Sequence, residues 1–414
     1  MPMPTRCPRS RGIAFLPSVP DAPFIPSGRT MSRPHDAVLQ QHATRAAFFM
    51  PGFAMAAWAP IVPFAKARAG LDDGSLGLVL LCPGAGSLLA MPLAGALTAR
   101  QGCRRMLMVA ALLICAVLPM LAVVSSPIAL GVALFVFGAG VGTMDCTMNM
   151  QAVVVERESG RALMSGFHAF YSIGGFVGAA ALTALLSVGA APWVACAIAV
   201  AVLVALLLGS MRYWRTERIA QDAPAFAWPR GIVLLIGAMC FVVFLAEGAM
   251  LDWGAVFLAD AKGMDEARAG IGYVVFSLAM TVTRLVGDGM VQRLGRLPTI
   301  IAGALVAFGG FVLATTLDAP SHALAGFALI GIGCANIVPA MFSLAGQQKT
   351  MPESLAIPAI TTLGYAGVLA GPALIGFIAQ GTTLVFAFLC VASALLAVAV
   401  ATRWLRAVSG AGSA

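Results

Sequence analysis

Two carboxylates lie inside long apolar stretches of the sequence. Asp145 lies in the run 129–155, and Glu247 lies in the run 231–258. A charge at the centre of a bilayer costs roughly 2.5 to 3.5 kcal/mol on insertion-based scales, so such acids persist mainly beside a partner or a water-filled path. Both acids are therefore candidates for proton coupling and for binding a polar solute. Glu247 is the stronger candidate, because its own stretch contains no lysine or arginine.

Other polar side chains could complete such a site. Asn149 follows Asp145 by four residues, so the two share one helix face that could hold a substrate hydroxyl. His168 could relay protons, because histidine titrates near neutral pH, and a packed, hydrogen-bonded histidine is the alternative. For Asp145 the alternative is a hydrogen bond that holds a neighbouring helix. For Glu247 it is a buried ion pair with Arg284.

Further candidates concern gating and substrate contact. Arg284 and Asp288 are also four residues apart, and we interpret them mainly as a structural ion pair or part of a gate. Trp58 could stack on the apolar face of a sugar-like ring, and Asn336 could bind a hydroxyl. The four histidines and nine cysteines show no metal-ligand spacing, so we expect neither a metal nor a cofactor.

Long apolar stretches must position these residues. Of the 414 residues, 60% are hydrophobic and 10% are charged, whereas about a quarter of a soluble domain is charged. Stretches of about 20 residues are long enough to span a bilayer as helices. We count twelve, with approximate cores at 45–66, 75–99, 105–125, 128–153, 162–187, 190–212, 231–258, 267–291, 297–317, 321–346, 354–380 and 382–403. The sequence therefore predicts an all-α integral membrane protein with twelve transmembrane helices.

Basic residues predict the orientation of these helices. With the N-terminus in the cytoplasm, 20 of the 25 Lys and Arg residues lie on that side, as the positive-inside rule requires. An even number of spans brings the C-terminus back to the same side. The net charge of +8 therefore reflects topology, and we expect no nucleic-acid partner because no basic and aromatic cluster is present. Residues 1–44 are rich in proline and arginine and are expected to form a disordered cytoplasmic arm, in which Met31 could be the true start.

Landmarks of the first half of the chain recur about 193 to 196 residues later. Arg100-Gln-Gly102 returns as Arg293-Leu-Gly295, and Gly138-Ala-Gly140 returns as Gly331-Ile-Gly333. Such duplication is common in transporter folds. It predicts two six-helix halves, 45–212 and 231–404, joined by a cytoplasmic linker, 213–230, and followed by a tail, 405–414.

These residues carry a family resemblance. The loop 95–105 is similar to the signature loop of the major facilitator superfamily, and the chain resembles that superfamily across all twelve spans. Finer motifs resemble its MosC-like, or YbjJ-like, branch: Asp145-Cys-Thr-Met-Asn149, Val155-Glu156-Arg157-Glu158, Gly166-Phe-His168-Ala-Phe-Tyr171 and Ala246-Glu247-Gly248.

The signature loop departs from the superfamily at one position. Where the signature loop of the superfamily has an acid, this chain has Ala99, and the second copy of the loop has Gln292. The resemblance implies that Arg100 and Arg104 take part in gating, while the missing acid weakens the cytoplasmic latch. We therefore expect Ala99→Asp to favour the outward-open state.

The resemblance also implies a function. Spans 1, 4, 7 and 10 of the superfamily line a central cavity, and here they carry Trp58, Asp145, Glu247 and Asn336. We expect a monomeric secondary active transporter in the bacterial inner membrane, which moves a small sugar- or cyclitol-like solute with protons by alternating access. Proton-coupled efflux of a metabolite or amphiphilic compound is the alternative. No P-loop, HExxH or nucleophile–base set indicates an enzyme.

Overall fold

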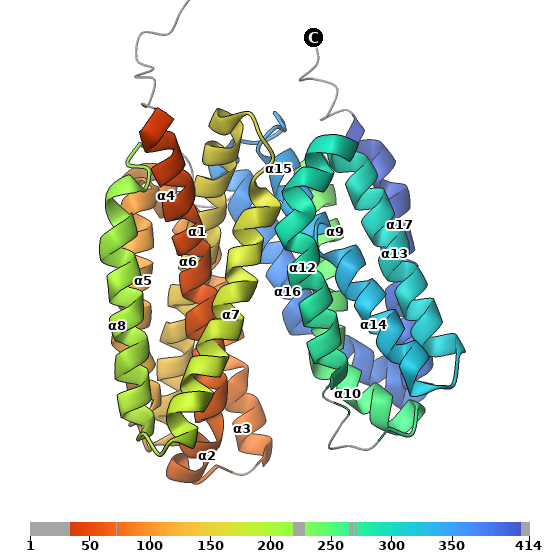
Figure 1. The fold of residues 1–414 in the computed structure, drawn as a ribbon, viewed down its shortest axis with the longest axis horizontal. Coiled ribbons are helices and arrows are strands. Elements are labelled where there is room, and N and C mark those ends of the chain that lie inside the picture. The colour runs from red at the N-terminus through yellow and green to blue at the C-terminus, as the bar shows by residue number, and fades with distance from the viewer. Residues whose placement is uncertain (1–33, 72, 218–227, 265–268, 270, 407–414) are drawn as a thin grey trace, which may run out of the picture.

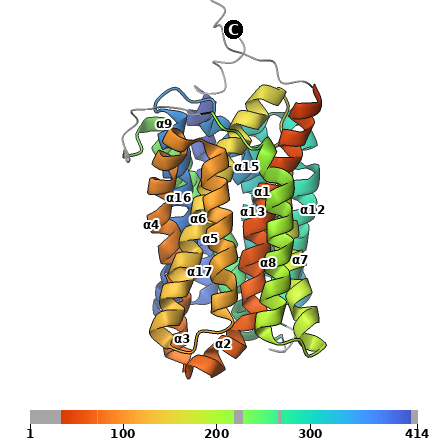
Figure 2. The same ribbon diagram turned by 90° about the vertical axis from the view of Figure 1, so that its left-hand side faces the viewer.

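Helices make up nearly all of the described chain. The computed structural model describes residues 34–71, 73–217, 228–264, 269 and 271–406. These helices form two bundles side by side, an N-terminal bundle of α1 to α8 and a C-terminal bundle of α9 to α17 (Figures 1 and 2). The first contains α1 (Pro34–Trp58), α2 (Val62–Ala69), α3 (Asp73–Leu80), α4 (Cys82–Gln101), α5 (Cys103–Leu121), α6 (Pro127–Ser159), α7 (Met164–Ser187) and α8 (Pro192–Ser210). The second contains α9 (Gly231–Asp252), α10 (Gly254–Val256), α12 (Ile271–Leu294), α13 (Arg296–Thr316), α14 (Pro320–Cys334), α15 (Ile337–Ala345), α16 (Glu353–Gly381) and α17 (Leu384–Ala401).

The predicted helical membrane fold is confirmed. Among the described residues, 11 helices are long and apolar enough to cross a membrane. They account for every predicted span except the first. That span is α1, whose apolar composition is diluted by His42 and Arg45 in its first half and which packs along α7 within the bundle. The span formed by α14 and α15 is broken at Ala335 and Asn336.

The predicted disordered arm is wrong for residues 34–44, which form the first turns of α1. Neighbouring elements hold these turns in place. Trp214 donates its indole N–H to the Ala43 carbonyl at 2.9 Å, and Gln151 donates its amide N–H to the Thr44 hydroxyl at 3.0 Å. Residues 1–33, including Met31, lie outside the described residues, as do 218–227 of the predicted linker and 407–414 of the predicted tail.

The two bundles repeat the same backbone turns at an interval of 193 residues. Gly102 and Gly295 have φ values of 86° and 88° and directly precede α5 and α13, the third membrane span of each bundle. These positive φ values favour glycine at both positions. The turn that follows α2 in the first bundle repeats after the short helix Phe257–Ala261 in the second, with Gly70 at φ 61° and Gly263 at φ 65°.

Close helix contacts repeat at the same interval. A Cβ atom at Gly138 would clash with the Pro83 carbonyl, and one at Gly331 would clash with the Phe276 carbonyl. Small residues at such crossings let helix backbones approach closely, which is how membrane helices gain packing energy. The repeat in the sequence therefore corresponds to a repeat of close helix packing in the structure.

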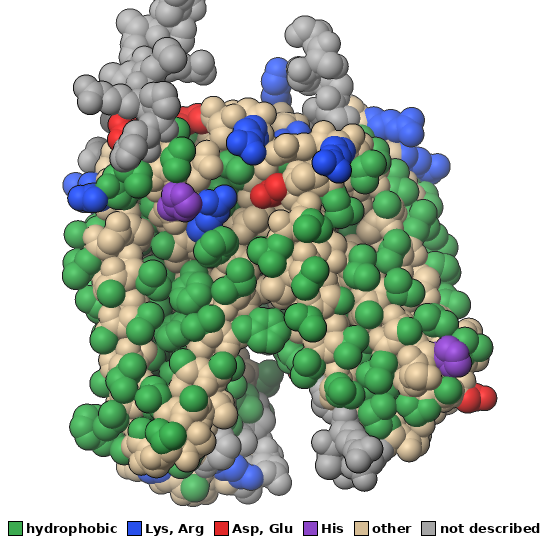
Figure 3. Space-filling view, viewed as in Figure 1, with side chains coloured by type: hydrophobic (Ala, Val, Ile, Leu, Met, Phe, Trp, Pro, Cys, Tyr) green, Lys and Arg blue, Asp and Glu red, His purple; other side chains and the backbone are tan. Residues whose placement is uncertain are grey.

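The faces of the molecule differ in charge and in shape. We call the face where α1 begins and α17 ends the terminal face, and the other the opposite face. Lys and Arg side chains gather on the terminal face, and the molecule is hollowed between the bundles on the opposite face (Figure 3). On the opposite face, Arg68 donates to the Val124 and Leu121 carbonyls at 2.8 Å each, and Lys262 donates to the Leu317 carbonyl at 2.8 Å. These two cations stabilise equivalent helix C-termini, where carbonyls lack intrahelical partners.

Candidate functional site

An ion pair lies between two helices of the C-terminal bundle. Arg284 on α12 approaches Glu247 on α9, with 3.4 Å between Nη2 and Oε1. Arg284 also donates Nη1–H to the Ser172 hydroxyl at 3.0 Å and Nε–H to the Ala335 carbonyl at 3.1 Å. The alternative interpretation of Glu247, a buried pair with Arg284, therefore describes this structure. The predicted pairing of Arg284 with Asp288 is wrong, because the guanidinium points to three other partners.

The break between α14 and α15 positions this arginine. The Ala335 carbonyl lies just past the C-terminus of α14, where the helix dipole favours a cation. Asn336 donates its amide N–H to the Thr283 carbonyl of α12 at 3.4 Å. Any Cβ atom at Gly287 would collide with the Asn336 side chain. This packing holds α12 against the break, and it places Asn336 beside the ion pair rather than in it.

Asp145 is in a different situation from Glu247. Its side chain is only 2% exposed, and neither carboxylate oxygen has a hydrogen-bond partner within the described part of the chain. Asn149 shares its helix face, as predicted, and donates its amide N–H to the Asp145 backbone carbonyl at 2.8 Å. The Asn149 side-chain oxygen is buried without a described partner. An isolated buried carboxylate is very costly as an anion, so this geometry favours the neutral, protonated acid.

Tyr171 and Ser172 lie on α7, where Tyr171 is partly buried against the hydrophobic core. Ser172, the next residue, makes the hydrogen bond to Arg284 that crosses between the bundles. From the sequence, Tyr171 is named only as the last residue of the motif 166–171, and Ser172, which directly follows that motif, has no assigned role.

Two predicted site residues lie in apolar surroundings. The His168 ring lies 5.1 Å from the Phe48 ring and 6.0 Å from the Phe342 ring, measured between centroids. Phe342 belongs to the C-terminal bundle, so His168 packs where the bundles meet. Trp58 is 6% exposed and belongs to the hydrophobic core. Both placements favour packing over direct contact with a solute.

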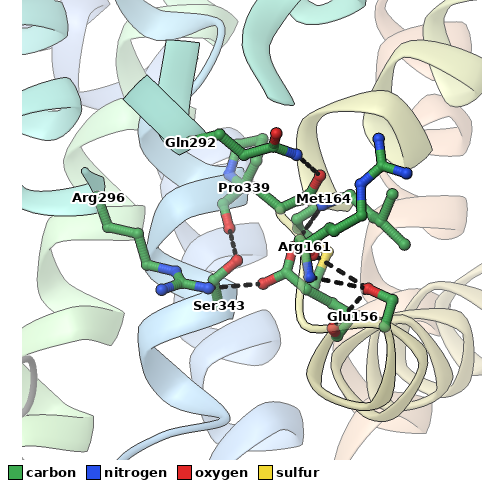
Figure 4. Close-up of polar contacts among 10 residues, drawn as sticks. Glu156, Arg161, Met164, Gln292, Arg296, Pro339 and Ser343 are labelled. Carbon is green, nitrogen blue, oxygen red and sulfur yellow. Dashed lines mark hydrogen bonds and ion pairs between the residues drawn. The ribbon is translucent and has the colours of Figure 1, made fainter. Parts of the chain in front are cut away.

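Polar contacts join the bundles on the terminal face. Glu156 at the end of α6 pairs with Arg296 at 3.3 Å, and its other carboxylate oxygen accepts the Leu163 and Met164 backbone N–H groups at 2.9 Å each (Figure 4). Glu156 therefore caps α7 in its own bundle while it binds the other bundle. Gln292 adds a crossing hydrogen bond to the Ala162 carbonyl at 3.2 Å. A cavity of about 490 Å³ lies beside these contacts.

Two more contacts close the same face. Arg157 pairs with Glu353 of α16 at 2.6 Å. Asp288 accepts the Gly166 backbone N–H at 3.1 Å, so this predicted gating residue does cross between the bundles, although without Arg284. Sequence reasoning assigned no role to Glu156, Arg157 and Glu353. Charges near helix ends resemble an ordinary solvated surface, and sequence alone does not show which helix ends meet.

The predicted gating arginines of the signature loop have other surroundings. Arg100 is exposed at the end of α4, and the Arg104 backbone N–H donates to the Arg215 carbonyl at 2.7 Å. Ala99, which replaces the signature acid, is fully buried. The crossing ion pairs described above come from other residues, at the ends of α6, α13 and α16.

Two duplicated helical bundles, with charged groups between them and one face closed, form the architecture of a multi-pass membrane transporter. The sequence model of the Major Facilitator Superfamily matches residues 46–356. The chain belongs to this superfamily, as its motifs indicated.

Relatives refine this assignment. An uncharacterized MFS-type transporter of Yersinia pestis is 51% identical over 367 residues, which cover 88% of this chain and 96% of the relative. The membrane protein MosC of Rhizobium meliloti is 31% identical over 347 residues, covering 81% of this chain and 83% of MosC. The predicted MosC-like branch is thus confirmed. In the crystal structure of the E. coli fucose:proton symporter FucP the fold is similar, with a TM-score of 0.74 at 15% identity over 89% of this chain and 99% of that chain.

Proposed function

We propose that this transporter moves a small polar, sugar- or cyclitol-like solute together with protons, by alternating access. One observation carries the proposal. Asp145 is a mid-span acid without a described partner, whereas Glu247 has an arginine. An acid that is buried in mid-span and stable when neutral is suited to take up and release a proton as its surroundings change.

This assignment reverses the ranking of the two acids from sequence. The sequence favours Glu247 because its own span contains no cation, but Arg284 supplies one from α12. Asp145 is therefore the proton carrier of the proposal, and Asn149 offers an unpartnered oxygen for a solute hydroxyl. The fold similarity to the fucose:proton symporter supports the solute class by analogy only.

The proposal also assigns the faces. Lys and Arg side chains concentrate on the terminal face, which is the cytoplasmic side under the positive-inside rule. With Glu156, Arg157 and Gln292 joining the bundles there, the solute path is closed to the cytoplasm and open to the outside. This corresponds to the outward-open state of a protein in the bacterial inner membrane.

Transport by purified protein in liposomes tests the proposal. With an imposed proton gradient, we expect uphill uptake of at least one member of a panel of neutral hexoses, pentoses and cyclitols. Asp145→Asn should abolish uphill uptake yet retain exchange of labelled for unlabelled solute, because asparagine resembles the neutral acid but cannot release a proton. Asp252→Asn, which removes an exposed acid at the end of α9, is the matched control and should leave both activities unchanged.

Two results would contradict the proposed function. Uphill uptake at the wild-type rate by Asp145→Asn would remove this acid from proton coupling. Proton-driven expulsion of an amphiphilic dye, with no uptake from the sugar and cyclitol panel, would favour the efflux alternative.

A further inference from the structure

The cavity beside the terminal-face contacts has a positively charged lining. Its volume is about 490 Å³, which is in the range of small-molecule sites. Arg157, Arg161 and Arg296 line it, together with one acid, Glu156. Arg161 belongs to the loop between α6 and α7 of the N-terminal bundle, and Arg296 begins α13 of the C-terminal bundle (Figure 4). The cavity therefore lies between the bundles, and cations outnumber acids in its lining.

Both oxygens of this acid already have donors. Oε1 of Glu156 pairs with Arg296 at 3.3 Å, and Oε2 accepts the Leu163 and Met164 backbone N–H groups at 2.9 Å each. A cation in the cavity would have to compete for these oxygens. An anion would not, because it binds to donors, so the lining favours an anionic ligand.

N–H donors of the lining remain available. Arg161 is exposed, and within the described part of the chain its guanidinium has neither a hydrogen-bond nor an ion-pair partner. Arg296 donates Nη2–H to Glu156, while its Nε is buried without a described partner. A guanidinium carries five N–H donors in a planar fork that matches phosphate oxygens. Both arginines can therefore donate further hydrogen bonds to an anion.

The start of α13 adds backbone donors. Gly295, the residue before this helix, lines the cavity and supplies no side-chain cap. The first N–H groups of a helix lack intrahelical partners and bear partial positive charge, so helix N-termini are common sites for phosphate. One phosphate group has several terminal oxygens, so it can accept hydrogen bonds from this helix and from both arginines.

The alternative is that the arginines only neutralise nearby helix ends. Gly160 and Gly346, which follow α6 and α15, also line the cavity, and helix C-termini favour cations. Among the described residues, however, none of the three guanidinium groups donates a hydrogen bond to a carbonyl at these ends. Arg157 donates to Glu353 and Arg296 donates to Glu156 instead.

We propose that the cavity binds a phosphate ester, with Arg161 and Arg296 as its two anchors. A phospholipid headgroup and a soluble organic phosphate share this chemistry. Because the anchors belong to different bundles, one bound phosphate joins them, and separation of the bundles on this face breaks one of its contacts. The ligand therefore shifts the population toward a closed terminal face. This consequence rests on the alternating access of the proposed function, whereas the binding itself does not.

Calorimetric titration of ribose 5-phosphate into full-length protein in detergent tests the site, with ribose as the uncharged comparison. We expect saturable binding of the phosphate and no binding of ribose. Arg161→Gln should weaken the binding about tenfold, because it removes a charge-assisted contact. Arg296→Lys keeps a charge beside Glu156 but loses the planar fork, so it should weaken the binding as well. Arg105→Gln removes an exposed arginine outside the cavity lining, so it is the matched control and should bind like wild type.

A competition titration separates a headgroup from a soluble phosphate. Displacement of ribose 5-phosphate by phosphatidylglycerol added to the micelles assigns the site to a headgroup, provided that Arg161→Gln weakens this displacement too. No displacement assigns the site to a soluble organic phosphate. Either result keeps a phosphate-ester site at this cavity.

Distances between spin labels test the link to conformation. The labels are attached to noncanonical residues at Val188 and Ser321, exposed positions of the two bundles on the opposite face. A Gln292→Ala background removes one crossing hydrogen bond but keeps both anchors, so that both states are populated. Ribose 5-phosphate should shift the population ratio toward the long distance by about tenfold, and ribose should leave it unchanged.

The phosphate site would be overturned if ribose 5-phosphate does not bind. It would also be overturned if Arg161→Gln and Arg105→Gln weaken binding equally, because binding would then follow surface charge alone. A shift toward the short distance would overturn the joining of the bundles. None of these measurements needs a transported solute or a gradient. A protein that binds ribose 5-phosphate but takes up no sugar would reject the proposed function and keep this inference, whereas sugar uptake without such binding would do the reverse.

Discussion

The two bundles share a scaffold but not a chemistry. At an interval of 193 residues they repeat glycines at positive φ and close helix crossings, and at 194 residues they repeat a cation that stabilises a helix C-terminus. The charged site residues do not repeat. Each has an apolar counterpart one interval away: Val338 for Asp145, Ala54 for Glu247 and Met91 for Arg284. The duplicated helices thus give the two bundles similar packing, and the charged site residues lie at positions where the two bundles differ in sequence.

The acids show the same contrast. Glu247 depends on a cation from its own bundle, whereas Asp145 is stable in this state without one. A duplicated scaffold lets one bundle hold an ion pair and the other a neutral acid without any change of fold. Comparing substitutions at matched positions can therefore separate what belongs to the scaffold from what belongs to the site.

The largest expected effect lies at the ion pair. Arg284→Gln leaves Glu247 half-buried without its cation, and breaking a buried pair costs about 3 to 5 kcal/mol; the partial exposure of Glu247 places this case at the lower end. Asp145→Asn should cost little, because it replaces a neutral acid by a neutral amide. Thermal unfolding in detergent should show a large fall in unfolding temperature for Arg284→Gln and almost none for Asp145→Asn.

The double variant with both Arg284→Gln and Glu247→Gln is the control for this comparison. It should recover much of the stability that Arg284→Gln alone loses, since no unpaired charge remains. Equal losses for Arg284→Gln and Asp145→Asn would mean that Asp145 is ionised in this state, and the contrast between the bundles would fail.

The scaffold should respond alike in both bundles. Gly138→Ala and Gly331→Ala each place a methyl group against a backbone carbonyl of the neighbouring helix. Overpacking of this kind costs about 1 to 3 kcal/mol, so we expect similar falls in unfolding temperature for both. Gly209→Ala on α8 is the control, because a Cβ atom added there would meet no other atom within 4 Å. A large fall in unfolding temperature for only one of these two variants would show that the two repeated helix crossings do not contribute equally to stability.

Much of this fold could be predicted because its signals are local. Apolar length located the spans, and the repeat predicted two bundles. Spacing of four residues correctly placed Asp145 and Asn149 on one face. The same spacing failed for Arg284 and Asp288, since it shows that two side chains are neighbours but not where each one points. Arg284 turns to α9, α7 and the break in the tenth span, and Asp288 turns to the start of α7.

Contacts between bundles were the harder part. Glu156 and Arg296 are 140 residues apart and meet only because two helix ends converge on the terminal face. No local pattern encodes that meeting. The same limit explains why Ser172 was missed, because its role depends on an arginine 112 residues away.

The smallest expected effect compares the two copies of the signature loop. Gln292 holds the position of the second acid and donates to the Ala162 carbonyl across the bundles, whereas Ala99 is fully buried in the first copy. Gln292→Ala should remove one hydrogen bond worth about 1 kcal/mol and shift the population toward opening of the terminal face. The sequence predicts that Ala99→Asp closes that face, but the structure places the new carboxylate in a buried position where it lowers stability instead. Distances between labels at Arg105 and Lys349, exposed positions on the terminal face of the two bundles, would report both variants. A stronger shift from Ala99→Asp than from Gln292→Ala, toward a closed terminal face, would restore the first loop as the principal latch.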